Sequence, residues 1–201
     1  MAVQSEKSLT EVWMELLRQV MEHGRDVDDE IREVMAVTTH FTTGSEDLSL
    51  LTRHGLDWTV PEMRKVFFSF EPNRFGHSYR PFWRGPCGKD DLSDVITLLR
   101  EQPSTKRALL AFVDPVGKRV PCLNLIHFLV RNERLDVTYF ARGQDIYLKF
   151  CADALCVFKF GAQVAEGIDV PLGSFAGTIS SAHVYRKDFA RVEAILGEGR
   201  E

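Results

Sequence analysis

Cys122 is the residue whose type and position best suit chemistry in this sequence. It follows Pro121 at the start of a predicted strand, just after a turn, where a side chain can face a cavity with a rigid backbone behind it. Cysteine attacks as a thiolate, which nearby cations stabilise, and Arg142 with the pair Lys106 and Arg107 supplies candidates. A lone cysteine at a strand start is more often packing than catalytic, and such cations are more often solvated surface charges. The wider sequence context has to decide between these interpretations.

The other cysteines and the histidines are predicted to be structural. Cys151 and Cys156 lie in an apolar segment, where cysteine behaves as a small hydrophobic residue, and we expect both to be buried. The four cysteines form no CxxC pair, and a reducing compartment would keep them as thiols. The six histidines are too scattered for a zinc site, so no metal is predicted.

Length and composition favour one ordinary globular domain over residues 1–201. The chain is 44% hydrophobic and 27% charged, and its formal net charge of −4 gives no basic surface for a nucleic-acid polymer. A nucleotide would be bound as a monomer by a few placed cations. No apolar run approaches the roughly 20 residues that span a bilayer, and the N-terminus has no signal-peptide pattern, so the expected location is cytoplasmic.

Helical and extended patterns alternate along the chain, while the stretch before Arg84 is poorly patterned. A hairpin with a long second arm is predicted over 123–150, turning at 131–134. This mixed order predicts an α+β fold around a single sheet. The remaining predicted elements are helices over 8–24, 90–102, 152–167 and 187–198, and strands over 33–42, 107–114 and 174–185.

Three segments carry a resemblance to a known family. RVPCLNLIHFLV, YFARGQDIYLKFCAD and GSFAGTISSAHVY, in this order and spacing, resemble the thymidylate synthase and deoxycytidylate hydroxymethylase superfamily. The resemblance covers about residues 75–195, with FGHSYR at 75–80 similar to the family motif Y-G-x-x-W-R. It implies a three-layer α+β fold in which helices flank one large mixed, mainly antiparallel, twisted sheet.

The resemblance also implies a reaction. The Cys122 thiolate would add to C6 of a pyrimidine nucleotide, and C5 would then attack 5,10-methylenetetrahydrofolate. The resulting methylene is either reduced to methyl by hydride or captured by water as hydroxymethyl. In the family, residues matching Arg142, together with Lys106 and Arg107 from the partner subunit, bind the 5′-phosphate, so a homodimer is expected.

Further site residues follow from the same match. His183 and Tyr185 correspond to residues that bind the sugar 3′-hydroxyl, and Asp145 to a carboxylate beside the base. The general acid–base glutamate is taken to be Glu62 rather than Glu46. The N-terminal phosphate-binding arginine is Arg25 or Arg32, with Arg25 preferred and surface charge as the alternative for both.

Asp153 departs from the thymidylate synthase pattern in an informative way. Thymidylate synthases carry asparagine there, which pairs with the uracil edge, whereas deoxycytidylate hydroxymethylases carry aspartate. A carboxylate accepts from the exocyclic amine of cytosine and leaves unpaired polar atoms against the O4 of uracil. The sequence therefore favours cytosine, with a simple helix N-cap as the structural alternative for Asp153.

Three small residues bear on whether the sugar is ribose or deoxyribose. Gly143, Ala176 and Gly177 are expected near the sugar pocket and would leave room for a 2′-hydroxyl, so CMP is preferred over dCMP. The chain is similar in this respect to cytidylate hydroxymethylases of nucleoside-antibiotic biosynthesis. Gly143, Phe75 and Leu123 replace family polar residues, and the chain ends at Glu201 without the family's hydrophobic tail, which favours capture by water.

Two alternatives remain open. The first is a thymidylate synthase that methylates dUMP, with Asp153 acting only as a cap. The second is a non-catalytic nucleotide-binding relative in which Cys122 is unreactive, an idea supported by the loss of polar residues at Phe75, Leu123 and Gly143.

Overall fold

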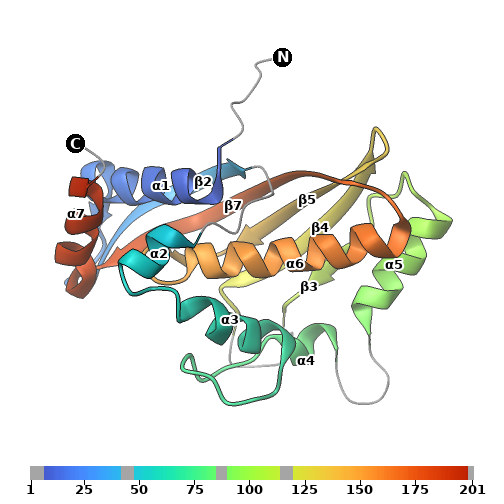
Figure 1. Cartoon of the computed structure of the whole chain (residues 1–201), viewed down its shortest axis with the longest axis horizontal. Helices are drawn as coiled ribbons and strands as arrows, with labels where there is room; N and C mark the ends of the chain where they lie inside the picture. The colour runs from blue at the N-terminus through green and yellow to red at the C-terminus, as the bar shows by residue number, and fades with distance from the viewer. Residues whose placement is uncertain (1–6, 42–47, 85–89, 114–119, 199–201) are drawn as a thin grey trace.

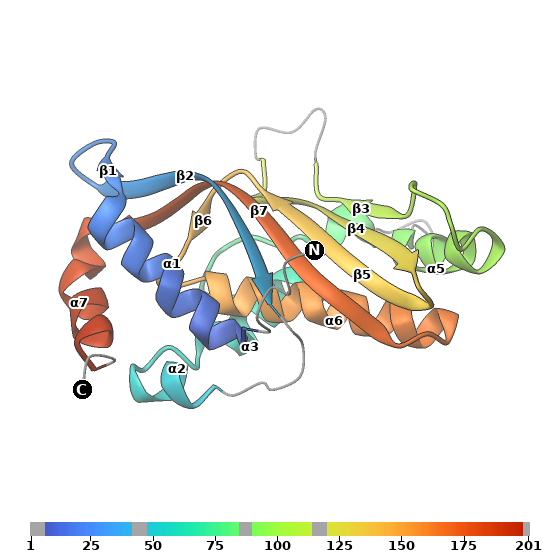
Figure 2. The ribbon, with the colours of Figure 1, turned by 90° about the horizontal axis from the view of Figure 1, so that it is seen from above.

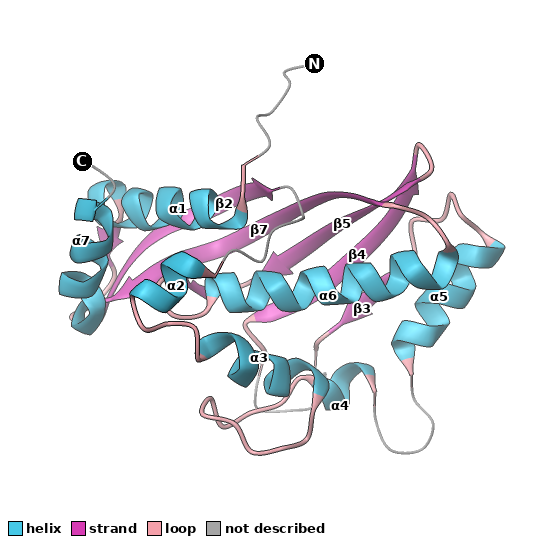
Figure 3. Cartoon of the chain, viewed as in Figure 1, coloured by secondary structure: helices cyan, strands magenta, loops and turns pink. Residues whose placement is uncertain are grey.

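The computed structural model describes residues 7–41, 48–84, 90–113 and 120–198. A single twisted seven-stranded sheet has the strand order β1-β2-β7-β5-β4-β3, with β6 beside β7 (Figure 1). Its strands are β1 (Arg25–Asp26), β2 (Ile31–Phe41), β3 (Leu109–Ala111), β4 (Leu123–Arg131), β5 (Arg134–Ala141), β6 (Gln144–Asp145) and β7 (Leu172–Tyr185). The helices, cyan in Figure 3, are α1 (Leu9–His23), α2 (Ser49–Arg53), α3 (Thr59–Phe68), α4 (Arg80–Trp83), α5 (Asp91–Glu101), α6 (Phe150–Ile168) and α7 (Phe189–Glu198), with the short 3-10 helix η1 (Arg186–Asp188) before α7.

Four strand pairs are antiparallel, and β7 runs parallel to both β5 and β6. The long helix α6 lies along the sheet, and Figure 2 shows α1, α2, α3 and α6 on one side of the strands. Most side chains of α6 are buried because the helix packs between the sheet and other helices. The prediction of an α+β fold with one large mixed, mainly antiparallel sheet flanked by helices is confirmed.

Local sequence signals explain where key elements begin and end. Ser8 and Glu11 form a capping box at the start of α1, each side chain binding the backbone of the other. Between β4 and β5, Asn132 and Glu133 have φ of 49° and 59°, which is the two-residue turn that matches strand twist. The predicted hairpin turn at 131–134 is therefore confirmed.

In the middle of the chain the sequence pattern did not predict the secondary structure. The stretch before Arg84 contains α2, α3 and α4, which were not predicted. The strand predicted over 107–114 is limited to Leu109–Ala111 among the described residues, and the turn predicted at 114–118 lies outside them. The second arm of the hairpin ends at Ala141 and is followed by β6, and Asp145 then accepts a hydrogen bond from the Leu148 N–H where the chain turns into α6.

The core on the helix side of the sheet is rich in aromatic rings. Phe67 of α3 contacts Tyr79, Phe112 and Phe160, all of which are buried. Trp13 of α1 donates its indole N–H to the Ile146 carbonyl at 2.7 Å, which fixes the loop between β6 and α6. Within the part of the chain that is described, no helix is both long and apolar enough to cross a membrane.

Candidate active site

Cys122 lies at the entrance to β4, in a hollow of about 540 Å³. The β4–β5 pairing sets Leu123 opposite Ala141, and the Arg142 N–H donates to the Cys122 carbonyl at 2.9 Å. The Cys122 N–H in turn donates to Tyr79 Oη at 3.1 Å. Backbone hydrogen bonds on both sides therefore fix the position of the thiol. The hollow is lined by His77, Ser78, Tyr79, Phe82, Val120, Pro121, Cys122 and Arg142.

Arg142 provides a cation at the thiol. Its Nη2 lies 4.0 Å from Cys122 Sγ. The same guanidinium donates to the carbonyls of Val120, at 2.8 Å, and Pro121, at 3.1 Å. The side chain is otherwise exposed, so it can bind an anionic substrate while it remains beside the sulfur.

The other described cysteines are core residues. Cys151 and Cys156 on α6 are buried, as predicted, and burial raises the pKa of both thiols. Cys87 lies outside the described residues. Among the cysteines that the structure describes, Cys122 is the one with access to a hollow.

Asp153 is a buried carboxylate inside α6. The helix begins at Phe150 with Lys149 as its N-cap, and the Asp153 N–H already donates to the Lys149 carbonyl. The interpretation of Asp153 as a helix N-cap is therefore wrong. Its carboxylate instead accepts a hydrogen bond from Gln144 Nε2. Burial raises the pKa of Asp153 to about 7, with the Gln144 hydrogen bond opposing the increase.

Tyr79 binds the Cys122 backbone and interacts electrostatically with the buried Asp153 carboxylate. Burial raises the pKa of Tyr79, and the nearby charges of Asp153 and Cys122 raise it further. The phenol therefore stays protonated near neutral pH and can donate its proton within the hollow. Sequence reasoning included Tyr79 only as part of the motif at 75–80, and the contact with Cys122 depends on the fold.

The β6–β7 pairing brings the predicted sugar-binding residues together. Asp145 lies opposite His183, and the His183 carbonyl accepts from the Ile146 N–H at 2.9 Å. A Cβ added to Gly143 would meet a single neighbour, His183 Cε1 at 3.8 Å. The fold does not require glycine here, so the missing side chain leaves space beside His183. The His183 and Tyr185 rings meet edge to face, with their centroids 5.4 Å apart.

A chain of polar contacts supports His183 from behind. Ser181 Oγ lies 3.4 Å from His183 Nδ1 and donates to Glu33 Oε2, while Arg25 Nη2 donates to Glu33 Oε1 at 3.1 Å. Glu33 is almost buried, and its pKa is lowered chiefly by the Ser181 hydrogen bond. Arg25 is thus linked to the predicted sugar-binding residues through Glu33 and Ser181. Glu33 and Ser181 were not predicted from the sequence as site residues, because their contacts form only through the β2–β7 register.

The structure does not bring Lys106 and Arg107 to the thiol of their own chain. The Lys106 carbonyl lies 3.0 Å from His127 Nε2 on β4, and His127 is about 16 Å along the strand from Cys122. Arg107 is exposed and donates to Gln102. These cations can reach a Cys122 site only on another chain.

Two further predicted residues also lie apart. Ala176 is about 23 Å along β7 from His183, paired with Thr138 and His40. Glu62 accepts from Lys65 Nζ and from the Arg74 N–H, and these bonds lower the pKa of its carboxyl. Glu46 lies outside the described residues. The roles assigned to Ala176 and Glu62 stay predictions.

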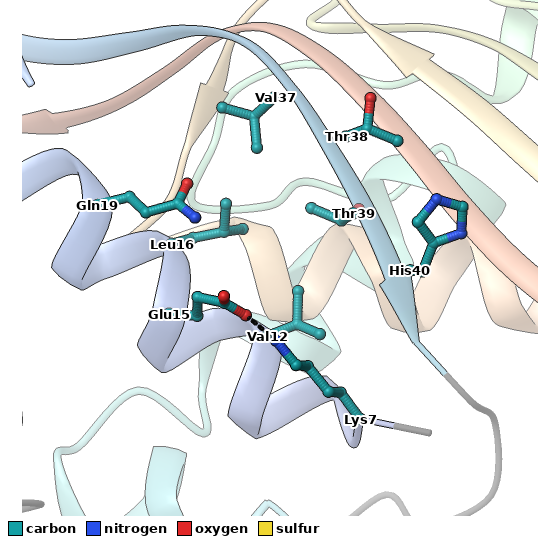
Figure 4. Close-up of a pocket in the computed structure, with 9 residues that line it drawn as sticks. All are labelled: Lys7, Val12, Glu15, Leu16, Gln19, Val37, Thr38, Thr39 and His40. Carbon is teal, nitrogen blue, oxygen red and sulfur yellow. Dashed lines mark hydrogen bonds and ion pairs between the residues drawn. The ribbon is translucent and has the colours of Figure 1, made fainter. Parts of the chain in front are cut away.

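Two other hollows differ from the thiol site in chemistry. One of about 280 Å³ lies between α1 and β2, where Lys7 pairs with Glu15 and the other walls are mostly Val, Leu and Thr (Figure 4). The second, of about 730 Å³, is lined by Trp58, Tyr147, Leu148 and residues of α7. Neither contains a cysteine. Over the described ranges, no cluster of His, Cys, Asp or Glu could hold a metal ion.

The sequence was compared with known proteins. The family model described as thymidylate synthase matches residues 30–200, which include Cys122, Arg142, Asp153 and His183. The chain belongs to the thymidylate synthase family. Family members act on a pyrimidine nucleotide with methylenetetrahydrofolate as the one-carbon donor. Membership therefore makes one-carbon transfer the class of reaction to which this site is related.

Several archaeal members of the thymidylate synthase family are similar over most of their length. A protein of Methanothermobacter thermautotrophicus described as "Putative thymidylate synthase" is 28% identical over 92% of this chain and 93% of its own. A protein of the same description from Methanosarcina mazei is 28% identical over 94% of this chain and 92% of its own. These similarities indicate common ancestry. They do not distinguish which base or which sugar of a nucleotide the site binds.

The raised pKa of Asp153 predicts a pH-dependent stability. The folded chain holds this proton more tightly than the unfolded chain, whose pKa is near 3.8, so the stabilisation is full below that value and is lost as pH rises through about 7. Asp153→Asn cannot ionise. Between pH 5 and pH 8 it should gain roughly 2 to 3 kcal/mol in free energy of unfolding relative to the wild type, measured by urea denaturation. The exposed Asp57→Asn is the control and should follow the wild type; a parallel decline in all three proteins would contradict the assignment.

Proposed function

We propose that this protein transfers a hydroxymethyl group to C5 of a cytosine nucleotide, with CMP preferred over dCMP. The observation that carries the proposal is Asp153, a buried carboxylate with a pKa raised to about 7, at the position where thymidylate synthases carry asparagine. A group with this pKa can both give and take a proton near neutral pH. The reaction consumes CMP, methylenetetrahydrofolate and water, and it yields 5-hydroxymethyl-CMP and tetrahydrofolate.

The first step is covalent activation by Cys122. The thiolate adds to C6 of the base, the S–C6 bond forms, and the electron pair of the C5–C6 double bond moves through C4 towards N3. Asp153 donates its proton to N3, which neutralises this charge and leaves C5 as an enamine-like nucleophile. Arg142, at 4.0 Å from the sulfur, supports the thiolate before attack.

The second step uses the folate carbon. One of the two nitrogen–carbon bonds of the methylene group opens, and C5 attacks the freed carbon. C5 then loses its proton and tetrahydrofolate leaves with the electron pair of the second nitrogen–carbon bond, so that an exocyclic methylene remains on C5. The proton from C5 and one proton of the water that adds next become the two N–H protons of tetrahydrofolate. Water adds to this methylene, N3 returns its proton to Asp153, and the Cys122 thiolate leaves as the C5–C6 double bond is restored. No oxidant or reductant is needed, because the transferred carbon stays at the oxidation level of formaldehyde.

The sugar and phosphate preferences rest on neighbouring residues. Gly143 leaves space beside His183, and a 2′-hydroxyl fits such a space while a serine side chain would fill it. Tyr185 and His183 are close enough to share the sugar hydroxyls. Arg142, beside Cys122, and Arg25, bound to Glu33, are the candidate cations for the 5′-phosphate.

A second copy of the chain would complete the phosphate site. Lys106 and Arg107 lie far from the thiol of their own chain, and the sheet face turned away from α6 carries one row of paired residues across five strands. Leu109, at the β3 end of this row, is 44% exposed. A homodimer through this face would bury apolar surface and bring new cations to each site. The row comprises His40, Ala176, Thr138, His127 and Leu109.

The larger hollow of about 730 Å³ suits the folate. Its aromatic walls include Trp58 and Tyr147, and its cations include Lys187 and Arg191, which match a flat pterin and a glutamate carboxylate. Ring contacts lead from Trp58 through Phe75, His77 and Tyr79 to the thiol hollow. This continuity supports neighbouring positions for folate and nucleotide.

The direct test is turnover of the full chain with methylenetetrahydrofolate and CMP, dCMP or dUMP. We expect a product about 30 mass units heavier than CMP, from added CH₂O, and none with Cys122→Ala. Mass spectrometry after chromatography is the measurement. A gain of about 14 units on dUMP, with dihydrofolate formed, would instead identify a thymidylate synthase. No product with any nucleotide would support the non-catalytic alternative.

Gly143 supplies a separate test of the sugar preference. Gly143→Ser should fold normally, because its Cβ meets only an ordinary contact at 3.8 Å. The ratio of kcat/KM for CMP to that for dCMP should fall about tenfold or more, since the hydroxymethyl side chain occupies the space for the 2′-hydroxyl. Gly197→Ser on α7, where an added Cβ meets nothing within 4 Å, is the control. An unchanged ratio in Gly143→Ser would remove this residue from sugar selection.

A further inference from the structure

Gln144 is a buried polar residue without a role in the steps of the proposed reaction. It lies on β6, paired with Ala182 of β7, and is 2% exposed. Its Nε2 donates to Asp153 Oδ2. Its other polar atom, Oε1, is buried and has no hydrogen-bond partner among the described residues. A buried acceptor without a donor costs free energy, so the fold retains a polar group that a bound molecule can satisfy.

The location of Gln144 connects both parts of the site. It directly follows Gly143 and precedes Asp145, which pairs with His183 on the sugar side. Its partner Asp153 acts electrostatically on Tyr79, whose hydroxyl binds the Cys122 backbone on the thiol side. The Gln144–Asp153 pair therefore adjoins both the sugar side and the thiol side of the site, where we expect the base of a bound nucleotide.

We propose that Gln144 is a specificity-determining residue that reads the C4 substituent of the pyrimidine. This inference rests on the proposed function. Asp153 Oδ1 donates a hydrogen bond to cytosine N3, and Gln144 Nε2 donates to Asp153 Oδ2. Gln144 Oε1 accepts a hydrogen bond from the exocyclic amine of cytosine. Three neighbouring hydrogen bonds then satisfy the orphan acceptor and fix the plane of the base.

The partner of Gln144 fixes the direction of its amide. With the Asp153 proton on Oδ1, where it faces N3, Oδ2 only accepts, so Nε2 must face Asp153 and Oε1 must face away from it. The free protein is then already arranged for an amine donor at C4. Uracil presents O4, an acceptor, at the same place, so O4 and Gln144 Oε1 would be two acceptors facing each other. To avoid this, the Gln144 amide must turn over and Asp153 must donate a hydrogen bond to Oε1. Cytosine needs no such rearrangement, and preorganisation of this kind favours its binding.

Binding to a catalytically inert protein separates this role from turnover. In a Cys122→Ala background, titration calorimetry with CMP and with UMP should give tighter binding of CMP. Adding Gln144→Met, which keeps the length of the side chain and removes both polar atoms, should weaken CMP binding about tenfold to a hundredfold and lower the CMP-to-UMP affinity ratio by a similar factor. Adding Gln144→Glu, which keeps an acceptor oxygen facing the base, should restore a preference for CMP.

Ribose 5-phosphate provides the control for folding. It contains the sugar and phosphate without a base, so its affinity should be the same with Gln144 or Met at this position. An unchanged CMP-to-UMP ratio in Gln144→Met would overturn the proposal, and so would a parallel loss of ribose 5-phosphate binding. If the Cys122→Ala protein itself prefers UMP, the cytosine assignment fails, while a change of UMP affinity in Gln144→Met would still support Gln144 as the reader of C4.

Discussion

The pairing of β4 with β5 is the constraint on which the site depends. A two-residue turn at Asn132 and Glu133 fixes the register of the two strands as far as Leu125 opposite Phe140, and a register shift between Leu123 and Leu125 then sets Leu123 opposite Ala141. The next hydrogen bond, from the Arg142 N–H to the Cys122 carbonyl, places a guanidinium beside the thiol. A slip of one residue would turn both side chains to the opposite face. The positions of the reactive sulfur and its cation therefore depend on the turn at the far end of the hairpin and on the register shift beside Cys122.

The same sheet assembles the rest of the nucleotide site from distant segments. β6 pairs with β7 to bring Gly143 to His183, and β2 pairs with β7 to bring Glu33 behind Ser181. The parallel pairing joins residues about 40 positions apart in the sequence, and the antiparallel pairing joins residues separated by more than a hundred positions. Rigid backbone pairing of this kind holds polar groups in place more accurately than loops do.

Sequence reasoning recovered the fold class, the hairpin and most long elements because these follow from local periodicity and turn chemistry. It also selected Cys122, Arg142 and His183, which the fold brings to one region. It did not find α3, where Pro61 and clustered aromatics obscure the helical pattern. It did not find Gln144, Glu33 or Ser181 either, because each becomes meaningful only through a partner that is remote in sequence. Asp153 was selected by resemblance, and only the structure excluded the cap interpretation.

Burial of Asp153 shows how stability and reactivity are balanced. Ionising a carboxyl group in the core destabilises the fold, and a single amide donor from Gln144 offsets part of this cost. A well-packed apolar residue at the same position would be less costly. A buried acid with a pKa near neutrality has a clear use where a proton must be given to a ring nitrogen and later taken back.

The central claim is that the Cys122 sulfur forms a covalent bond to C6 of a cytosine ring. Its most direct test is intact-protein mass spectrometry after incubation with methylenetetrahydrofolate and the 5-fluoro analogues of CMP and dUMP. Fluorine at C5 cannot leave as a proton does, so the adduct of protein, base and folate should accumulate. The account predicts a stable adduct with 5-fluoro-CMP, mapped to Cys122 by peptide sequencing and absent in Cys122→Ala. An adduct formed only with the 5-fluoro-dUMP analogue, or one attached to a different residue, would contradict it.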